Sequence, residues 1–123
     1  MMAQKTILSA EDNAANRKII RDLLGSRGHK VIEAVDGEEV IRLAETEKPD
    51  LILMDIQLPR ISGYDAATAI KGNPALAHIP IIAITSYALS GDEQKAFAAG
   101  CNDYVTKPFR PAMLLKKVER YLE

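Results

Sequence analysis

The sequence LILM at residues 51–54 gives the clearest indication of the fold. Four consecutive apolar residues without polar alternation are typical of a parallel strand that is covered on both faces. Pro49 breaks the chain before this run, and Asp55 follows it. A second run of the same kind, IPIIAI at residues 79–84, ends at Thr85. The two runs predict two buried strands of a parallel sheet.

Shorter strand and helix signals extend outward from these runs. Residues 6–10 and 104–106 read as short strands, and residues 30–34 as a more polar strand expected at an edge of the sheet. Apolar spacing and capping residues predict five helices. The first spans residues 13–27 and is stopped by Gly28, the second is capped by Asp36, and the third runs through Ala66, Ala67 and Ile70. The fourth runs from Ser90, with Glu93 in a capping box, to Gly100, and the fifth begins at Pro111. Five strands that alternate with five helices imply an α/β fold with a parallel sheet and helices on both faces.

Length and composition indicate one globular domain. The chain has 123 residues, 47% of them hydrophobic and 27% charged, and a chain of this size can bury a real core. Sixteen Lys and Arg against seventeen Asp and Glu give a net charge of −1, which argues against a nucleic-acid binder that works by bulk charge. No apolar run approaches the roughly 18–20 residues that cross a membrane, and the first six residues do not resemble a signal peptide. We therefore expect a cytoplasmic protein without membrane or nucleic-acid partners.

Residues that can do chemistry follow four of the five expected strands. In open α/β sheets the ligand site lies beyond the carboxyl ends of the strands, where the sequence places Glu11, Asp12, Asp55, Thr85 and Lys107. Each residue alone has an ordinary explanation as a turn former, a strand former or a solvated charge. Three carboxylates at one sheet edge, however, repel one another unless a cation compensates them. Oxygen ligands of this kind favour Mg²⁺, and Lys107 adds one further positive charge.

The ordered set of these residues resembles the receiver domains of two-component response regulators. The matching positions are Glu11-Asp12-Asn13, residues 54–59 (MDIQLP), Ser62-Gly63, Thr85 and Lys107-Pro108. The resemblance runs from the first strand to the last helix and is strongest to stand-alone receivers of the DivK type. It implies a flavodoxin-like (βα)5 doubly wound sheet with strand order 2-1-3-4-5. It also implies a single, monomeric receiver domain over residues 1–123, without an output domain.

This resemblance implies that Asp55 is the phosphorylation site. Asp55 would take a phosphoryl group from a sensor histidine kinase or a histidine phosphotransfer protein. Glu11 and Asp12 would form an acidic pocket for Mg²⁺, with Asp12 binding directly or through water and Glu11 through water. Asp55 and the backbone carbonyl of Gln57 would complete the protein ligands. The attack of a carboxylate on a phosphoryl group needs such positive charge, because two anions must approach each other.

Three further residues have implied roles around the phosphoryl group. Thr85 would hydrogen-bond one phosphoryl oxygen and Lys107 would pair with another, beside a Lys107–Pro108 peptide bond that is cis. Tyr104 occupies the switch position of the family. When Thr85 moves toward the phosphoryl group, Tyr104 would turn inward and change the face near residues 90–100. The signal would then pass to a downstream protein target by protein–protein contact, without enzymatic activity beyond the domain's own phosphorylation and dephosphorylation.

Some positions depart from the common pattern of the family. Ser9 is a polar residue in an expected buried strand and needs a hydrogen-bond partner. Ser86 stands directly after Thr85, where the family usually keeps Ala or Gly, so Ser86 either narrows the access of the phosphodonor or adds a hydrogen bond. Tyr87 and Gln57 occupy positions that tune dephosphorylation, which leaves the lifetime of the phosphorylated state open.

Four further functional classes compete with a phosphorylated receiver. A flavin- or nucleotide-binding enzyme would need a Gly-, Ser- or Thr-rich phosphate loop after the first strand, where this chain has Glu11 and Asp12. A phosphatase of the haloacid dehalogenase type would need a second acid two residues after Asp55, where Gln57 stands. A receiver fragment of a hybrid kinase and a non-phosphorylated adaptor receiver stay open as well.

A few residues outside this set have competing interpretations. Arg17, Lys18 and Arg21 form a basic stripe on the first expected helix, which is either a solvated face or a docking site for an acidic helical partner. His29 is expected in an exposed loop, because it follows no metal-ligand spacing. Met113 is expected in the core, on the apolar face of the last helix.

Overall fold

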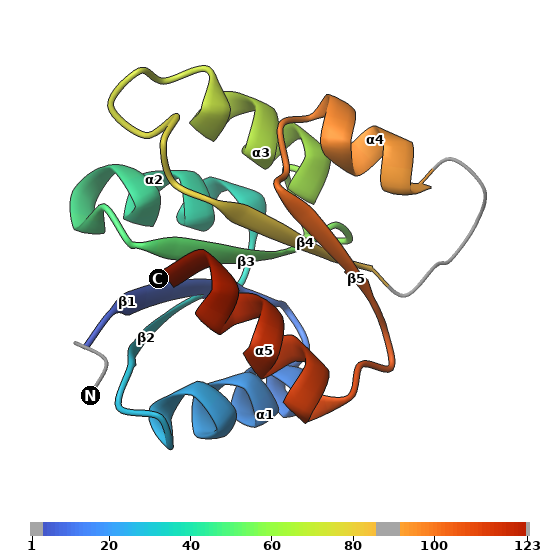
Figure 1. The fold of residues 1–123 in the computed structure, drawn as a ribbon. Coiled ribbons are helices and arrows are strands. Elements are labelled where there is room, and N and C mark those ends of the chain that lie inside the picture. Colours follow the sequence, from blue (N-terminus) through green and yellow to red (C-terminus); the bar gives the residue numbers. More distant parts are fainter. Residues whose placement is uncertain (1–3, 86–91, 123) are drawn as a thin grey trace.

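Five strands alternate with five helices in the computed structural model, which describes residues 4–85 and 92–122 (Figure 1). The strands are β1 (Thr6–Ala10), β2 (Lys30–Ala34), β3 (Leu51–Asp55), β4 (Ile81–Thr85) and β5 (Asp103–Thr106). The helices are α1 (Ala14–Gly25), α2 (Gly37–Glu47), α3 (Gly63–Lys71), α4 (Asp92–Ala98) and α5 (Pro111–Leu122). The predicted alternation of strand and helix along the chain is confirmed.

The strands form one parallel sheet in the order β2-β1-β3-β4-β5. This is the predicted order of a flavodoxin-like doubly wound sheet. β2 lies at an edge, as its more polar sequence predicted, and β3 lies between β1 and β4 with all its residues buried. The chain reverses its winding direction between β1 and β3, so the segments that follow these two strands lie at one crevice. The register, which pairs Ala10 with Met54 and Asp55 with Ile84, brings the strand ends close together there.

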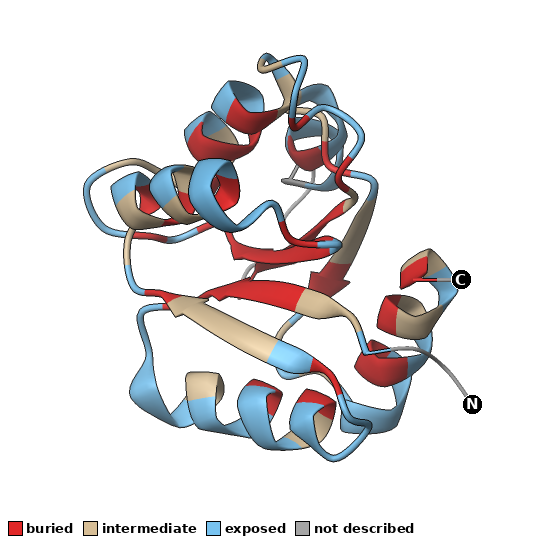
Figure 2. Ribbon diagram, turned by 90° about the vertical axis from the view of Figure 1, so that its left-hand side faces the viewer, coloured by how far each residue is buried: buried red, intermediate tan, exposed pale blue. Residues whose placement is uncertain are grey.

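Helices cover both faces of the sheet. α1 and α5 pack on one face, and α2, α3 and α4 pack on the other (Figure 1). Leu51 and Leu53 belong to the core under α1 and α5, while Ile52 and Met54 belong to the core under the other three helices. Figure 2 shows the same arrangement, with the central strands of the sheet and the inward sides of the helices buried. The unbroken apolar run at residues 51–54 is the direct consequence of this two-sided burial.

Two element boundaries differ from the predicted ones by two residues. α1 ends at Gly25, two residues earlier than predicted, because the chain begins to turn there and reaches the left-handed region at Gly28, with φ 83°. β4 begins at Ile81, two residues later than predicted, because Pro80 has no N–H with which to continue the strand ladder. Neither shift moves the residues at the carboxyl ends of the strands.

Two side chains lie elsewhere than predicted. His29 is buried, because the turn after α1 places it against the chain before β1, where Lys5 N donates to its Nδ1 (3.4 Å). Met113 is 52% exposed. It directly precedes Leu114, the first buried residue of α5. The residues of α5 that are buried are Leu114, Leu115, Val118 and Leu122.

Three sequence predictions fall outside the described residues. Ser90, the predicted cap of the short fourth helix, is one of them, and Ser86 and Tyr87, which depart from the family pattern, are the others. α4 itself is described from Asp92 to Ala98. The chain turns at Gly100, with φ 101°, close to the predicted end of this helix.

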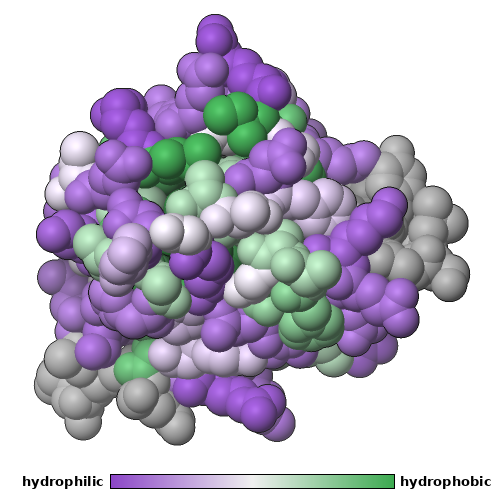
Figure 3. Space-filling model, turned by 90° about the horizontal axis from the view of Figure 1, so that it is seen from above, coloured by the Kyte–Doolittle hydropathy of each residue, from purple (hydrophilic) through white to green (hydrophobic). Residues whose placement is uncertain are grey.

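The face formed by α3 and α4 is mainly hydrophilic. Figure 3 looks onto this face and shows hydrophilic side chains over most of it, with hydrophobic ones in smaller areas between them. Among the helices of the described ranges, none combines the length and the apolar character that a bilayer-spanning segment requires.

Candidate functional site

The ends of β1, β3 and β5 bring three predicted site residues into direct contact. Lys107 follows β5, and its Nζ lies 2.6 Å from Glu11 Oε1 and 2.8 Å from Asp55 Oδ2. All three side chains are shielded from solvent, with exposed fractions of 14% for Lys107, 2% for Glu11 and 4% for Asp55. The partners are far apart in the sequence, so the contact exists only because parallel strands end at one edge of the sheet.

Burial and neighbouring charges set the protonation of this cluster. Burial and the Asp55 carboxylate raise the pKa of Glu11 from 4.5 to about 7, although Lys107 and the backbone N–H of Asn13 act in the opposite direction. Burial alone would lower the pKa of Lys107, but its hydrogen bonds to Asp55 and Glu11 outweigh burial and raise that pKa. Lys107 is therefore a cation at neutral pH, whereas Glu11 exchanges a proton near neutrality.

The loop after β3 fixes the position of Asp55. Gln57 N donates to Asp55 Oδ1 (2.9 Å), and Gly63 N donates to Ile56 O (2.8 Å). The N-terminus of α3 therefore packs directly on the backbone of β3. A Cβ atom at Gly63 would lie 2.3 Å from Asp55 O and 2.6 Å from Ile56 Cα. Only glycine allows this close approach, which explains the Ser62-Gly63 element of the sequence pattern.

The start of α1 shapes the acidic pair. Asn13 N donates to Glu11 Oε2 (3.1 Å), and Asn13 Oδ1 accepts from Asn16 N (3.0 Å) as the cap of α1. Arg17 Nη1 donates to the backbone carbonyls of Glu11 (3.0 Å) and Asp12 (2.9 Å). The side chain of Glu11 and the backbone of both acidic residues are thus held by groups of the following helix, a contact that the sequence did not reveal.

Three carboxylates converge closely enough to share one ion. One oxygen from each of Glu11, Asp12 and Asp55 lies within 4.8 Å of the other two. Hard oxygen ligands at this separation suit a divalent cation such as Mg²⁺, which binds oxygen at about 2.1 Å. Asp12 is exposed, so the group opens to solvent on one side, and Gln57 lines the same depression. The donor set therefore fits Mg²⁺, which retains several waters when it binds to proteins.

Thr85 and Tyr104, the two predicted switch residues, lie on adjacent strands. Thr85 ends β4 and is buried, and its carbonyl accepts a hydrogen bond from Lys107 N (2.6 Å). Tyr104 is half-buried and packs against the core under α2, α3 and α4. Its register partner on β4 is Ala83, two residues before Thr85. Because residues two apart on a strand share a face, Thr85 and Tyr104 lie on the same face of the sheet.

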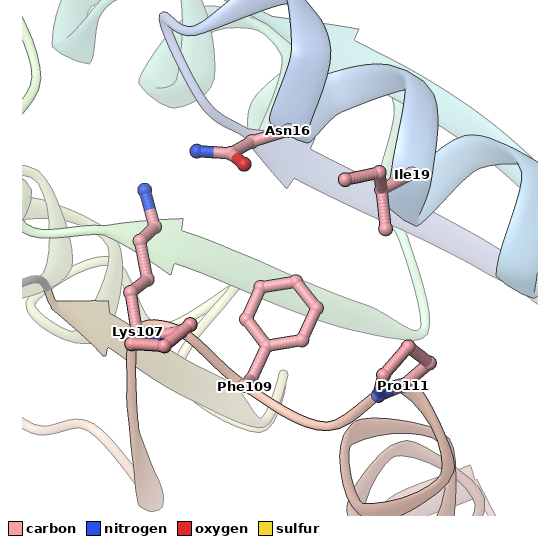
Figure 4. A pocket seen from close by; sticks show the side chains of 6 residues that line it. Asn16, Ile19, Lys107, Phe109 and Pro111 are labelled. Carbon is pink, nitrogen blue, oxygen red and sulfur yellow. The ribbon is translucent and has the colours of Figure 1, made fainter.

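A groove that the sequence did not predict opens beside Lys107. Its volume is about 400 Å³, and its lining residues are Asn16, Ile19, Lys107, Pro108, Phe109 and Pro111. Figure 4 shows Asn16 and Ile19 on α1 across from Lys107 and Phe109 on the segment between β5 and α5. The Lys107–Pro108 peptide bond in this segment is cis, as predicted. Ile19 is 46% exposed, whereas its neighbour Ile20 is buried.

The basic stripe on α1 does not form one free surface. Arg17 is bound to the backbone carbonyls of the acidic pair. Lys18 Nζ lies 2.6 Å from Asp22, and Arg21 Nη1 lies 2.9 Å from Glu33. Each cation thus has a partner within the chain.

Ser9 is a buried polar residue whose hydroxyl has no hydrogen-bond partner among the described residues. The residue is 1% exposed, and the unpartnered atom is its Oγ. Ser9 pairs in register with Glu33 on β2, whose Oε2 is also buried without a partner among those residues. This departure from the family pattern is therefore real in the fold, and it lies on β1, the strand that leads into Glu11 of the acidic cluster.

A comparison with known protein families shows to which family this chain belongs. The family described as the response regulator receiver domain matches residues 7–119. The chain belongs to this family. The match runs from β1 to α5 and includes all residues of the buried cluster, so the resemblance drawn from the sequence is confirmed. A receiver is a signalling domain, and this assignment sets aside the flavin- or nucleotide-binding enzyme and the phosphatase.

Relatives of this receiver match it over nearly its whole length. It is 40% identical over 118 residues to the polar-differentiation response regulator DivK of Brucella anthropi, which covers 96% of both chains. It is also 40% identical to the receiver domain of a sensor histidine kinase from Pseudomonas aeruginosa PAO1, with a TM-score of 0.90 over 98% of each chain. That structure holds a magnesium ion coordinated in its active site cleft. A putative response regulator from Chloroflexus aurantiacus, 29% identical, gives a TM-score of 0.93 over 98% of each chain. The prediction of a DivK-like receiver is confirmed.

Proposed function

We propose that this receiver accepts a phosphoryl group on Asp55 and signals by contact with a downstream protein. The observation that carries the proposal is the buried cluster in which Lys107 Nζ lies 2.8 Å from Asp55 and 2.6 Å from Glu11. A fixed carboxylate beside a fixed cation is suited to phosphoryl transfer, which depends on positioning and on charge stabilisation. The donor would be a sensor histidine kinase or a histidine phosphotransfer protein.

The proposed transfer forms one bond and breaks one. A carboxylate oxygen of Asp55 attacks the phosphorus of a phosphohistidine, the P–N bond breaks, and the imidazole leaves. The product is an acyl phosphate on Asp55, which water later hydrolyses to restore the carboxylate. Lys107 would pair with one phosphoryl oxygen, and the Thr85 hydroxyl would donate to another. Gln57 N, which donates to Asp55 Oδ1 (2.9 Å), would keep the carboxylate oriented during the attack.

We propose Mg²⁺ as the cofactor of this step. Asp12, Asp55 and the backbone carbonyl of Gln57 would hold the ion, with Glu11 acting through water. The bound ion supplies positive charge where Asp55 and the phosphoryl oxygens approach each other. Support comes from the carboxylate oxygens that lie within 4.8 Å of one another, and from the magnesium ion in the Pseudomonas receiver.

Magnesium affinity is expected to rise with pH up to neutrality. The pKa of Glu11 is raised to about 7 by burial and by Asp55, so below this pH Mg²⁺ must compete with a proton. Calorimetric titrations between about pH 6 and pH 8 should show tighter binding as pH rises, by at most about tenfold per unit. In Glu11→Gln this dependence should be largely lost. An equally steep dependence in the variant would contradict the role of Glu11.

The same raised pKa affects stability in the metal-free protein. The folded state binds the Glu11 proton more tightly than the unfolded chain does, because the pKa is 4.5 in the unfolded state and about 7 in the folded state. The contribution of Glu11 to the free energy of unfolding therefore falls as pH rises through this window. Urea unfolding of wild type and Glu11→Gln at several pH values between the two pKa values measures this contribution. A difference between the two proteins that does not vary with pH would contradict the assignment.

We propose that residues 1–123 act as one monomeric receiver domain in the cytoplasm. In support, the family match covers residues 7–119 and all described strands join one sheet. Its only chemistry would be its own phosphorylation and dephosphorylation. A non-phosphorylated adaptor is not favoured, because every residue that the chemistry needs is present.

The surface around Tyr104 is expected to change when Asp55 is phosphorylated. Thr85 and Tyr104 lie on the same face of adjacent strands, so a shift of Thr85 toward the phosphoryl group would open space for the Tyr104 ring. Amide chemical shifts recorded with a beryllium fluoride phosphoryl mimic and Mg²⁺ should change at Thr85, Tyr104 and α4. The Asp55→Asn control should show no such change. Shifts confined to the loops around Glu11, Asp55 and Lys107 would contradict the switch and leave phosphorylation intact.

Phosphotransfer profiling tests the proposed function. Phosphorylated histidine kinases and phosphotransfer proteins of the source organism are incubated with the receiver in Mg²⁺. At least one donor should lose its label to the receiver much faster than the others do. If every donor keeps its label, the proposed partner class is wrong.

A further inference from the structure

One arginine of α1 is bound to the backbone of the acidic pair rather than to its carboxylates. Arg17 Nη1 donates to Glu11 O (3.0 Å) and to Asp12 O (2.9 Å). Arg17 is half-buried, and among the described residues no carboxylate forms an ion pair with it. The two other cations of the same helix, Lys18 and Arg21, pair with carboxylates instead.

These two bonds fix the peptide units that carry the acidic side chains. The carbonyl of Glu11 and the carbonyl of Asp12 belong to consecutive planar peptide groups, which together set the direction of the Asp12 Cα–Cβ bond. A charged donor forms stronger hydrogen bonds than a neutral one. Arg17 therefore holds the exposed Asp12 in the direction that brings its carboxylate within 4.8 Å of the Glu11 and Asp55 oxygens.

We propose that Arg17 is a positioning residue for the Mg²⁺ site, an inference that rests on the proposed function. It does not touch the ion or the reacting atoms. Its role is to orient the acidic pair before the ion arrives, so that little ordering remains to be done when the ion binds. Because Arg17 contacts neither the ion nor the reacting atoms, its loss should lower Mg²⁺ affinity more than it affects the chemistry of the bound complex.

A purely electrostatic role for Arg17 has the opposite sign. A guanidinium close to a cation site repels the incoming ion, so its removal would tighten Mg²⁺ binding. If Arg17 instead orients the acidic pair, its removal weakens Mg²⁺ binding. The direction of the change in Mg²⁺ affinity therefore distinguishes the two roles without reference to its size.

The test compares two arginines of the same helix. Arg17→Met should weaken Mg²⁺ binding, measured by calorimetry, by about tenfold. Its rate of phosphorylation by acetyl phosphate should be slowed at low Mg²⁺ and return to within about twofold of wild type at saturating Mg²⁺. The matched control Arg21→Met, which breaks the pair with Glu33, should bind Mg²⁺ as wild type does. Arg17→Gln keeps one donor and should lie between Arg17→Met and wild type.

Each outcome has a distinct meaning. Mg²⁺ binding by Arg17→Met that equals or exceeds that of wild type would overturn the positioning role, as would a phosphorylation defect that persists at saturating Mg²⁺. If Arg17→Met does not fold, judged by circular dichroism, Arg17→Gln decides by the same criteria. Wild-type protein that fails to bind Mg²⁺ would instead contradict the proposed function itself.

Discussion

Asp55→Asn is expected to abolish uptake of a phosphoryl group. The amide is a far weaker nucleophile than the carboxylate, and it removes one of the two anions that Lys107 contacts. Incubation with acetyl phosphate and Mg²⁺ should add one phosphoryl group to wild type and none to the variant, as measured by intact mass. The variant should remain folded, because the amide oxygen can still accept the bond from Gln57 N.

Substitution of the neighbouring Asp12 provides the control for this result. Asp12→Asn removes a proposed metal ligand but leaves Asp55 in place, so its phosphorylation should be slowed and not abolished. Phosphorylation of Asp55→Asn at the wild-type rate would show that another residue is the acceptor. The assignment of Asp55 would then be wrong, although the fold would be unaffected.

Gly63→Ala is expected to destabilise the fold and disturb Asp55 at the same time. The new Cβ would lie 2.3 Å from Asp55 O and 2.6 Å from Ile56 Cα, and both are backbone atoms that cannot move aside cheaply. Overpacking of this kind costs about 3 kcal/mol, so urea unfolding should show a large fall in the free energy of unfolding. Phosphorylation of Asp55 should be slowed as well, even at urea concentrations below the unfolding midpoint of the variant, because α3 packs on the backbone that carries the nucleophile.

Gly25→Ala is the matched control for this substitution. Gly25 is the last residue of α1, and nothing lies within 4 Å of the Cβ that alanine would add there. Alanine favours the helix over glycine by about 0.5–1 kcal/mol, so this variant should be as stable as wild type or slightly more so. Equal stability of Gly63→Ala and Gly25→Ala would contradict the close packing of α3 on β3.

The fold could be predicted because its signals are local. An unbroken apolar run such as residues 51–54 requires cover on both faces, and strands that alternate with helices leave few arrangements. The site could be predicted in part for the same reason, because parallel strands end at one edge and carry Glu11, Asp55 and Lys107 to it. The order of the strands and the roles of these residues came from the family resemblance.

Features that depend on side-chain direction could not be predicted. Ile19 and Met113 share the spacing of core residues, yet both are about half exposed, because a helix can rotate slightly without any change in its sequence pattern. His29 is buried by a turn whose path no local signal fixes. The bonds from Arg17 to two backbone carbonyls are equally invisible in the sequence, where Arg17 appeared as one of three similar cations.

Chemical mapping of the acceptor residue shows whether Asp55 takes the phosphoryl group. The receiver is phosphorylated with acetyl phosphate, and the acyl phosphate is then reduced with borohydride, which converts the modified aspartate to homoserine. Peptide mass spectrometry should find homoserine at position 55, only when both acetyl phosphate and Mg²⁺ are present. Homoserine at position 12, or at any aspartate other than Asp55, would contradict the assignment of Asp55 as the acceptor. Modification of Asp55 at an equal rate without Mg²⁺ would contradict the role of the metal ion.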